Sequence, residues 1–532
     1  MTGRAEVRAV MLNPENGKNR KTGKKPRVML AASASCSGKT LITCVLLQAL
    51  KNRGLVPDAF KCGPDYIDPM FHRTVTGKDS RNLDSFFSDR HEICRIIASG
   101  EGDCAVLEGV MGIYDGADME SFRGSCYEVA LESETPVILI VDAARKGRTL
   151  LAEIKGILSE DQEGCIKGLI LNQISASFYA SLKGVLEKEL KQAGFRTAVL
   201  GYLPVLSGLN LNSRHLGLVL PGEIGDLPVQ MEKAAKVMEQ SVDVNTILKV
   251  MNLAGVPEIG GAADDITDHA VTDTADPAVT DAADPAVTNI TDHAVTDITD
   301  HAVTDTAVHA GAGSTEHFSE EDPLTLGVAY DSAFCFYYRE NLDLFAKKGV
   351  KVLFFSPLRD QSIPEHVSGL LFGGGYPELH LKELSENKSM LDSVREAIGR
   401  GIPSLAECGG FMYLHDTITD AAGETYRLAG AVKGACRYTG HLVRFGYLEL
   451  LSSRMQDEYY QSFVGMRGHE FHYYESTACG DSYVAGKPFK DRKWSCMVTE
   501  KNGFWGFPHF YYGSNPEAVD RFIQKMHDVR VP

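Results

Sequence analysis

The sequence predicts two α/β domains, each built on a parallel sheet and joined to the other by an acidic connector. The chain has 532 residues, which is too long for one ordinary hydrophobic core and suits two domains. Short apolar segments alternate with helical patterns in both halves, as in parallel sheets covered by helices on both faces. A repetitive acidic segment separates the halves.

The expected strands are short runs of β-branched and apolar residues. In the first half they are Arg27–Ala31, Cys104–Leu107, Pro136–Val141 and Lys167–Leu171. Helices are expected between them, for example at Leu41–Lys51 and Leu150–Leu158. In the second half the expected strands are Leu326–Ala329, Lys351–Phe355, Gly369–Phe372 and Pro403–Ala406.

The connector contains five eight-residue units between Asp268 and Ala307, of the type DHAVTDTA. These units are small and acidic and lack aromatic residues, so they bury too little apolar surface to offset the entropy of ordering. The pattern predicts a disordered linker. A short solenoid is an alternative for a period of eight, but its repeats would need large apolar residues for stacking, whereas these units are small and acidic. A further alternative is metal binding by the five histidines of this region, which is disfavoured because no carboxylates orient them. These histidines are His269, His293, His301, His309 and His317.

The predicted boundaries are a basic disordered tail at 1–25, a first domain at 26–250, the linker at 251–323 and a second domain at 324–532.

The net charge of −17 belongs almost entirely to the connector: residues 264–322 carry fifteen acidic side chains and no Lys or Arg, which leaves −2 elsewhere. This acidity therefore says nothing about the partners of the two domains. The domains also show no basic stripe of the kind that binds nucleic acid. No apolar run is long enough to span a membrane, and no signal peptide is apparent.

The twelve cysteines are scattered without a CxxC pair, which argues against a disulfide framework or a zinc ribbon. Reduced cysteines indicate a cytoplasmic protein.

The first half contains a phosphate-binding loop. Strand RVMLAA runs into Ser33-Ala34-Ser35-Cys36-Ser37-Gly38-Lys39-Thr40 and then into an apolar helix. Backbone N–H groups around Ser37 and Gly38 would hold phosphate oxygens, Lys39 would neutralise β/γ charge, and Thr40 would ligate Mg²⁺. Ser33 replaces the usual first glycine. A serine-rich turn with a chance Gly-Lys-Thr is the alternative, which the strand–loop–helix placement disfavours.

Carboxylates follow several strands of this half, at the edge where open α/β sheets bind ligands. Glu108 follows strand CAVL, Asp142 follows VILIV, and Asp65 and Asp68 lie in the loop KCGPDYIDP. A nucleotide site needs one or two such groups for magnesium, so Asp65 and Glu108 join Thr40 as candidate ligands. Taken singly, each of these carboxylates is explained equally well as a helix-cap or turn residue.

The second half contains a candidate nucleophile, Cys408, between strand IPSLAE and the helical segment FMYLHD. Flanking glycines and the helix N-terminus are typical of a nucleophile elbow, and the helix dipole is expected to lower the pKa of the thiol. The segment LLFGGGYPE would offer backbone N–H groups to an oxyanion.

The candidate base is His509, in GFWGFPHF, with His469 and His472 of RGHEFHYYES as competitors. Class I glutamine amidotransferases keep their histidine at a similar place in the chain order, followed two residues later by a glutamate. This chain has Tyr511 there, so the third, orienting member is missing or comes from elsewhere.

Several long motifs resemble the cobyrinate and hydrogenobyrinate a,c-diamide synthases. They are FKCGPDYIDPMFHRTVTGKDSRNLDSFF, VLEGVMGIYDG and NSRHLGLV in the first half, and GLLFGGGYPELH, AECGGFMYL and GHEFHYYES in the second. The resemblance implies a dethiobiotin-synthetase-like P-loop domain and a flavodoxin-like class I glutamine amidotransferase domain. It also implies that Asn172 contacts adenine and that Cys408 and His509 suffice as a catalytic pair.

The implied reaction uses ATP and Mg²⁺ to activate a substrate carboxylate as an acyl phosphate, which ammonia from glutamine then amidates. The implied partners are small molecules: a corrinoid polycarboxylate, ATP and glutamine, with no nucleic acid and no membrane. The sequence does not decide whether the protein forms a homodimer. Hydrogenobyrinate and nickel-sirohydrochlorin are competing substrates that the sequence does not separate from cobyrinate. A hypothesis of another class is a MinD-like ATPase switch fused to an inactive amidotransferase module, which an intact Cys408 and His509 disfavour.

Overall fold

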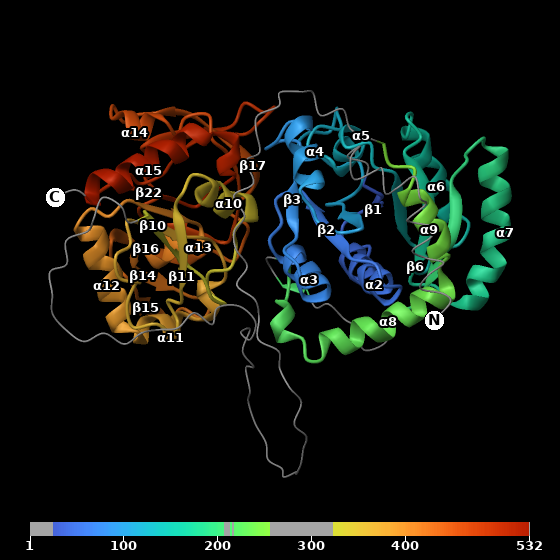
Figure 1. The fold of residues 1–532 in the computed structure, drawn as a ribbon, viewed down its shortest axis with the longest axis horizontal. Coiled ribbons are helices and arrows are strands. Elements are labelled where there is room, and N and C mark those ends of the chain that lie inside the picture. Colours follow the sequence, from blue (N-terminus) through green and yellow to red (C-terminus); the bar gives the residue numbers. More distant parts are fainter. Residues whose placement is uncertain (1–24, 207–212, 215–216, 256–322, 531–532) are drawn as a thin grey trace, which may run out of the picture.

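A computed structural model describes residues 25–206, 213–214, 217–255 and 323–530. The predicted N-terminal tail (except for Lys25) and the octapeptide repeat lie outside the described residues. The two halves lie side by side (Figure 1), and each is built around its own parallel sheet. The prediction of two α/β units with parallel sheets is confirmed.

The N-terminal half is a seven-stranded parallel sheet in the order β3-β2-β4-β1-β5-β6-β7. Its strands are β1 Arg27–Ala32, β2 Pro57–Cys62, β3 Arg81–Leu83, β4 Cys104–Glu108, β5 Val137–Asp142, β6 Ile166–Asn172 and β7 Ala198–Leu203. A short pair, β8 Ser213–Arg214 and β9 Gly217–Leu218, lies apart from this sheet. The four strands predicted here agree with β1, β4, β5 and β6 to within a residue or two.

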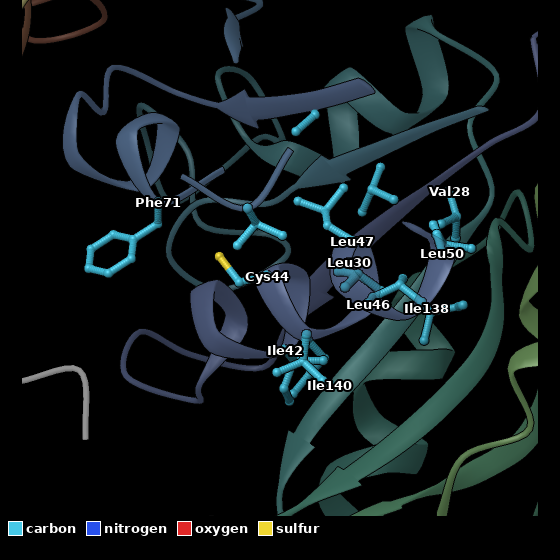
Figure 2. Close-up of a cluster of buried hydrophobic side chains, with 14 of the residues drawn as sticks. Val28, Leu30, Ile42, Cys44, Leu46, Leu47, Leu50, Phe71, Ile138 and Ile140 are labelled. Atoms are coloured by element: carbon cyan, nitrogen blue, oxygen red, sulfur yellow. The ribbon is translucent and has the colours of Figure 1, made fainter. Parts of the chain in front are cut away.

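Helices cover both faces of this sheet because its strands are apolar on both sides. They are α2 Lys39–Asn52, α3 Ile67–Thr76, α4 Arg90–Ala98, α5 Cys126–Glu132, α6 Thr149–Glu160, α7 Ala176–Gln192, α8 Leu227–Ser241 and α9 Val244–Met251, with the 3₁₀ turn η2 Pro221–Glu223. Alternation along β1 divides the core: Val28 and Leu30 pack with α2, whereas Met29 and Ala31 pack with the opposite layer. Figure 2 shows Val28 and Leu30 among side chains of α2 and β5.

The C-terminal half contains a five-stranded parallel sheet in the order β11-β10-β12-β13-β22. Its strands are β10 Thr325–Ala329, β11 Lys351–Phe355, β12 Gly369–Phe372, β13 Ser404–Glu407 and β22 Gly503–Gly506. The helices and 3₁₀ turns of this half are α10 Arg339–Lys347, η3 Pro377–Leu379, α11 Leu381–Glu386, α12 Lys388–Gly399, α13 Gly409–Tyr413, α14 Glu458–Gln461, η4 Tyr512–Ser514 and α15 Pro516–Arg530.

Two further sheets complete this half, and the sequence analysis did not predict them. One has the order β15-β14-β16-β19, with strands β14 His415–Thr419, β15 Thr425–Arg427, β16 Val432–Tyr438 and β19 Tyr474–Ser476. The other is antiparallel, in the order β21-β20-β17-β18-β23, with strands β17 Arg444–Ser453, β18 Arg467–His472, β20 Tyr483–Gly486, β21 Lys493–Cys496 and β23 His509–Phe510. The second of these sheets positions the histidines discussed below.

The halves meet through an aromatic interface bordered by ion pairs. Phe86 and Phe87 of the first half pack against Tyr447 of the second, with ring centroids 4.6 and 5.6 Å away. The Tyr447 hydroxyl donates a hydrogen bond to Asp84 (2.8 Å). At the rim, Arg81 pairs with Asp343 at 2.7 Å. These contacts place α10 and β17 against β3 and its following loop (Figure 1).

Candidate active site

The phosphate-binding loop connects β1 to α2, as predicted. Gly38 ends the loop with φ 87°, a left-handed conformation, and a side chain there would lie 2.5 Å from the Asn172 amide nitrogen. The Ser37 hydroxyl donates to the carbonyl of Ala34 (2.9 Å). The Lys39 ammonium donates to the carbonyls of Ala34 (3.0 Å) and Met111 (2.6 Å). Lys39 therefore lies over the loop that would hold the phosphates.

Burial, together with the nearby Lys61 ammonium, lowers the pKa of Lys39. A partly dehydrated ammonium over the loop gains more from an anionic ligand than an exposed one does, because water screens it less. The site is thus electrostatically suited to a polyphosphate.

Beside Thr40 lies a buried carboxylate network centred on Glu108, which is fully buried at the end of β4. The Thr40 hydroxyl donates to Glu108 Oε1 (2.8 Å), and the Lys61 ammonium lies 2.8 Å from the same oxygen. His72 Nε2 lies 2.7 Å from Glu108 Oε2, and Lys61 also pairs with Asp68. Burial opposes ionisation, but Lys61 and His72 hold the pKa of Glu108 below its usual range.

Asp65 has a local structural role. Its Oδ1 accepts hydrogen bonds from the backbone N–H groups of Ile67 (2.9 Å) and Asp68 (3.0 Å), so that it caps the first turn of α3. Within the described residues, no group of three or more His, Cys, Asp or Glu side chains is arranged to hold a metal ion. The metal ligands Thr40, Asp65 and Glu108 thus stay a prediction, in which Thr40 and Glu108 have the better geometry.

Asn172 ends β6 next to the same loop. Its amide nitrogen donates to the Ser37 carbonyl (2.9 Å), and its Oδ1 accepts from the backbone of Gln173 (3.0 Å). These bonds brace the loop, and the expected contact between Asn172 and adenine stays a prediction.

Cys408 occupies a strained turn between β13 and α13. Its φ of 44° and ψ of −103° are rare for a residue with a side chain, and such strain is characteristic of a nucleophile elbow. The turn is crowded: a side chain at Gly410 would lie 2.2 Å from the Phe372 carbonyl, and one at Gly409 would lie 3.2 Å from the Gly375 backbone nitrogen. The glycine loop after β12 therefore lies directly beside the elbow.

The expected lowering of the Cys408 pKa is wrong for this structure. Burial raises the pKa of the Cys408 thiol above its ordinary value, and Glu378 adds to this shift. A hydrogen bond from the Gly409 backbone lowers the pKa, but by less. Helix α13 has only five residues, so its dipole is too weak to overcome desolvation. Burial thus favours the neutral thiol, so a role as nucleophile would require a base.

His509 lies on β23, opposite His469 of β18, and both belong to the antiparallel sheet that the sequence analysis missed. Their rings stack with centroids 5.0 Å apart and planes 14° apart. On the other side, a side chain at Gly374 would lie 2.2 Å from His509 Cε1, so the ring contacts the glycine loop. Burial, with His469 and His472 nearby, lowers the pKa of His509 well below its ordinary value. The His509 ring therefore lies against the glycine loop that flanks the elbow, and burial favours its neutral form, as a base would require.

Glu407 is a candidate orienting residue that the sequence analysis did not identify. It immediately precedes Cys408, and its Oε2 lies 4.0 Å from His509 Nδ1. Its Oε1 accepts from the Tyr512 hydroxyl (2.8 Å), and burial raises the pKa of Glu407 to about 8. The available sequence signal was its position immediately before Cys408, in the motif AECGG. Tyr511, at the usual glutamate position, instead stacks on Phe87 in the interface, with centroids 5.4 Å apart.

His472, the other competitor, is near enough to His509 to help lower its pKa, but its described contacts are with other groups. Its Nδ1 bonds the Tyr474 carbonyl (2.7 Å), and its ring stacks on Phe507 with centroids 4.0 Å apart. It also lines a cavity of about 120 Å³ together with Glu470. His472 thus lines this cavity, whereas the ring of His469 stacks on that of the candidate base.

Comparisons with known proteins agree with this geometry. Residues 325–506 match the family model of the CobB/CobQ-like glutamine amidotransferase domain. The cobyrinate a,c-diamide synthase of Caldanaerobacter subterraneus subsp. tengcongensis is 34% identical over 502 residues, which cover 93% of this chain and 97% of that protein. The chain belongs to the cobyrinate a,c-diamide synthase family.

Other members of the family show similar agreement. The cobyrinate a,c-diamide synthase of Clostridium acetobutylicum is 32% identical, over 93% of this chain and 99% of that protein. The one of Salmonella typhimurium is also 32% identical, over 93% of this chain and 97% of that protein. Family membership and the amidotransferase domain make the chain an amide-forming enzyme. Among the described residues, no helix is long and apolar enough to span a membrane.

Proposed function

We propose that this protein amidates the a and c acetate carboxylates of cobyrinate in cobalamin biosynthesis, using ATP for activation and glutamine as the nitrogen donor. The observation that carries the proposal is the presence, in one chain similar to these synthases over 93% of its length, of a phosphate-binding loop and a Cys408–His509 pair. We further propose that residues 26–250 form the ATP-binding domain and 324–532 the amidotransferase domain, with 251–323 as linker.

In the amidotransferase domain, Cys408 is the proposed nucleophile. Because His509 Nδ1 faces Glu407, Nε2 is the ring nitrogen left to accept the thiol proton. The thiolate attacks the glutamine carboxamide carbon, and the backbone N–H groups of Gly375 and Gly409, two residues that lie close together, are the proposed donors to the oxyanion. His509 returns the proton as ammonia leaves, and water hydrolyses the resulting thioester to glutamate.

In the ATP-binding domain, a substrate carboxylate oxygen attacks the γ-phosphorus and ADP leaves. Ammonia then attacks the acyl carbon of the acyl phosphate, and phosphate departs as the amide forms. Lys39 neutralises the charge that develops on the transferred phosphoryl group, and the loop N–H groups hold the remaining phosphates.

Mg²⁺ fits the residues at the end of the phosphate-binding loop. The Thr40 hydroxyl and the Glu108 carboxylate, 2.8 Å apart, are hard oxygen donors of the kind that this ion prefers. When bound, the ion would neutralise phosphate charge. The Glu108 carboxylate is kept ionised by Lys61 and His72, as a ligand must be.

The test is amidation of candidate tetrapyrroles by the purified full-length chain with ATP, Mg²⁺ and glutamine, followed by mass spectrometry of the product. Conversion of two carboxylates of cobyrinate to amides is the expected result. Turnover of hydrogenobyrinate or nickel-sirohydrochlorin alone would reassign the substrate and leave the mechanism standing. Glutamate release without any amide product would instead contradict the proposed ligase.

A further inference from the structure

Tyr66 is an ATP-domain residue whose side chain belongs to the glutaminase site. It lies between Asp65 and the start of α3, in the loop KCGPDYIDP, and is only 8% exposed. Its ring packs on rings of the amidotransferase domain: it is parallel to Phe336 (5.2 Å between centroids, 7° between planes) and lies 4.8 Å from Tyr338.

The same ring also touches both histidines of the candidate site. Its centroid lies 5.4 Å from that of His509 and 5.8 Å from that of His469. The Tyr338 hydroxyl bonds His469 Nδ1 at 3.1 Å, so Tyr66 and Tyr338 hold the stacked histidine pair from one side. The candidate base is thus enclosed partly by its own domain and partly by the other.

The residues on either side of Tyr66 connect to the phosphate-binding loop. Asp65 caps the turn that begins immediately after Tyr66, and Asp68 in that turn pairs with Lys61. Lys61 in turn contacts Glu108, which accepts the hydrogen bond of Thr40. A change at Glu108 therefore has a short path of charged contacts to the backbone that carries Tyr66.

We propose that Tyr66 is a positioning residue for glutamine hydrolysis, supplied by the ATP-binding domain, which holds the His509 ring in place and shields it from water. The proposal rests on the proposed role of Cys408 and His509 as the glutaminase pair. It assigns part of the support of the catalytic base to a domain that takes no chemical part in glutamine hydrolysis.

Shielding has a measurable electrostatic consequence. Burial lowers the pKa of His509 below its ordinary value of about 6.5, with smaller contributions from His469 and His472. The Glu407 carboxyl also faces the ring, at 4.0 Å, but it is unchanged in variants of Tyr66, so a shift between variants reports on His509. Removing the Tyr66 ring admits water, which brings the pKa of His509 back up toward that value. Glutaminase activity is lost as the pH falls through the pKa of the base, so the acidic limb of the profile should move to higher pH.

The experiment measures glutamate release by the full-length protein as a function of pH and glutamine concentration, with no tetrapyrrole present. The variants are Tyr66→Leu, which removes the ring but keeps apolar volume, and Tyr66→Phe, which keeps the ring. Phe86→Leu is the matched control, because Phe86 is a similarly buried interface ring (9% exposed) that packs on Tyr447 away from the histidines. Thermal unfolding of each variant checks that it is folded.

We expect Tyr66→Leu to lower kcat/KM for glutamine at least about tenfold, mainly through kcat, and to shift the acidic limb upward. Tyr66→Phe should restore both quantities, and Phe86→Leu should resemble the wild type. Unchanged kcat and acidic limb in folded Tyr66→Leu would overturn the proposal, as would an equal change in Phe86→Leu. If Tyr66→Leu does not fold, a Tyr66→Met variant takes its place with the same expected outcomes. Failure of the proposed function would appear separately, as a wild-type chain that releases no glutamate.

Discussion

Replacing Glu407 by Gln tests whether this carboxylate orients the catalytic histidine. The carboxylate Oε2 lies 4.0 Å from His509 Nδ1, and the side chain has no other cation beside it in the contacts that the structure describes. When His509 takes the proton of Cys408, an imidazolium forms next to this group. At 4 Å, two unit charges attract by about 4 kcal/mol with an effective dielectric constant of 20, which is an upper limit on the stabilisation lost.

This limit corresponds to roughly a 10³-fold loss of rate, because each 1.4 kcal/mol is a factor of ten. We expect Glu407→Gln to lower kcat/KM for glutamine by about 10²–10³-fold at pH 9 and by less at pH 7, because the pKa of Glu407 is raised to about 8 and ionised carboxylate increases as the pH rises through that value. The wild type should therefore gain glutaminase activity between about pH 7 and 9, and the variant should not.

The assay is glutamate release from pH 6 to 9.5, in parallel with amidation driven by ammonium salt, which should be unaffected. Glu340→Gln is the control, since Glu340 is another buried carboxyl, with its pKa raised to about 7, that pairs with Arg81 at the interface. Equal pH profiles for the wild type and Glu407→Gln would refute the assigned role.

Further predictions separate the two halves of the reaction. Lys39→Ala should abolish amidation with glutamine and with ammonia, since activation precedes nitrogen attack; substantial ammonia-dependent product would show that the loop is regulatory. Cys408→Ala should abolish glutamate release but retain ammonia-dependent amidation at alkaline pH, and loss of both in a folded protein would contradict this division. Gly374→Ala places a methyl group 2.2 Å from His509 Cε1 and should lower glutaminase activity about 10²-fold without affecting ammonia-dependent product, as parallel assays would reveal. Replacing 268–307 by a Gly/Ser spacer of similar length should preserve coupled turnover, measured as amide formed per glutamine consumed, and a large loss would assign the repeat a specific role.

The sequence predicted well those parts of the fold that depend on local pattern. The parallel strands are continuous apolar runs, so β1, β10 and β12 were recognisable without tertiary information. The glycines that these tight turns require likewise allowed the phosphate-binding loop and the elbow at Cys408 to be predicted from the sequence. The antiparallel sheet was missed because β17 and β18 alternate irregularly between buried and exposed residues, and β23 is only two residues long.

The site was predicted where one motif carries it and missed where distant segments meet. Register between β18 and β23 places His469 on His509, and this pairing is not visible in either segment alone. The sequence analysis left the orienting residue missing or supplied from elsewhere, because Tyr511 stands at the usual glutamate position. Glu407, whose Oε2 lies 4.0 Å from His509 Nδ1, comes from a segment about a hundred residues earlier in the chain, so the sequence alone did not connect the two. The thiol pKa was misjudged because the extent of burial depends on the packing of the whole domain.

The ion pairs and hydrogen bonds at the domain interface restrict how this enzyme can be recombined. Arg81 with Asp343, Arg339 with Asp79, and Asp84 with Tyr447 each draw one partner from either side of the linker. A chimera that takes its ATP-binding domain from one relative and its amidotransferase domain from another would keep these contacts only where both donors carry the matching partner residues. Where one donor lacks a partner, both residues of the pair would have to be transferred together to restore the interface contact.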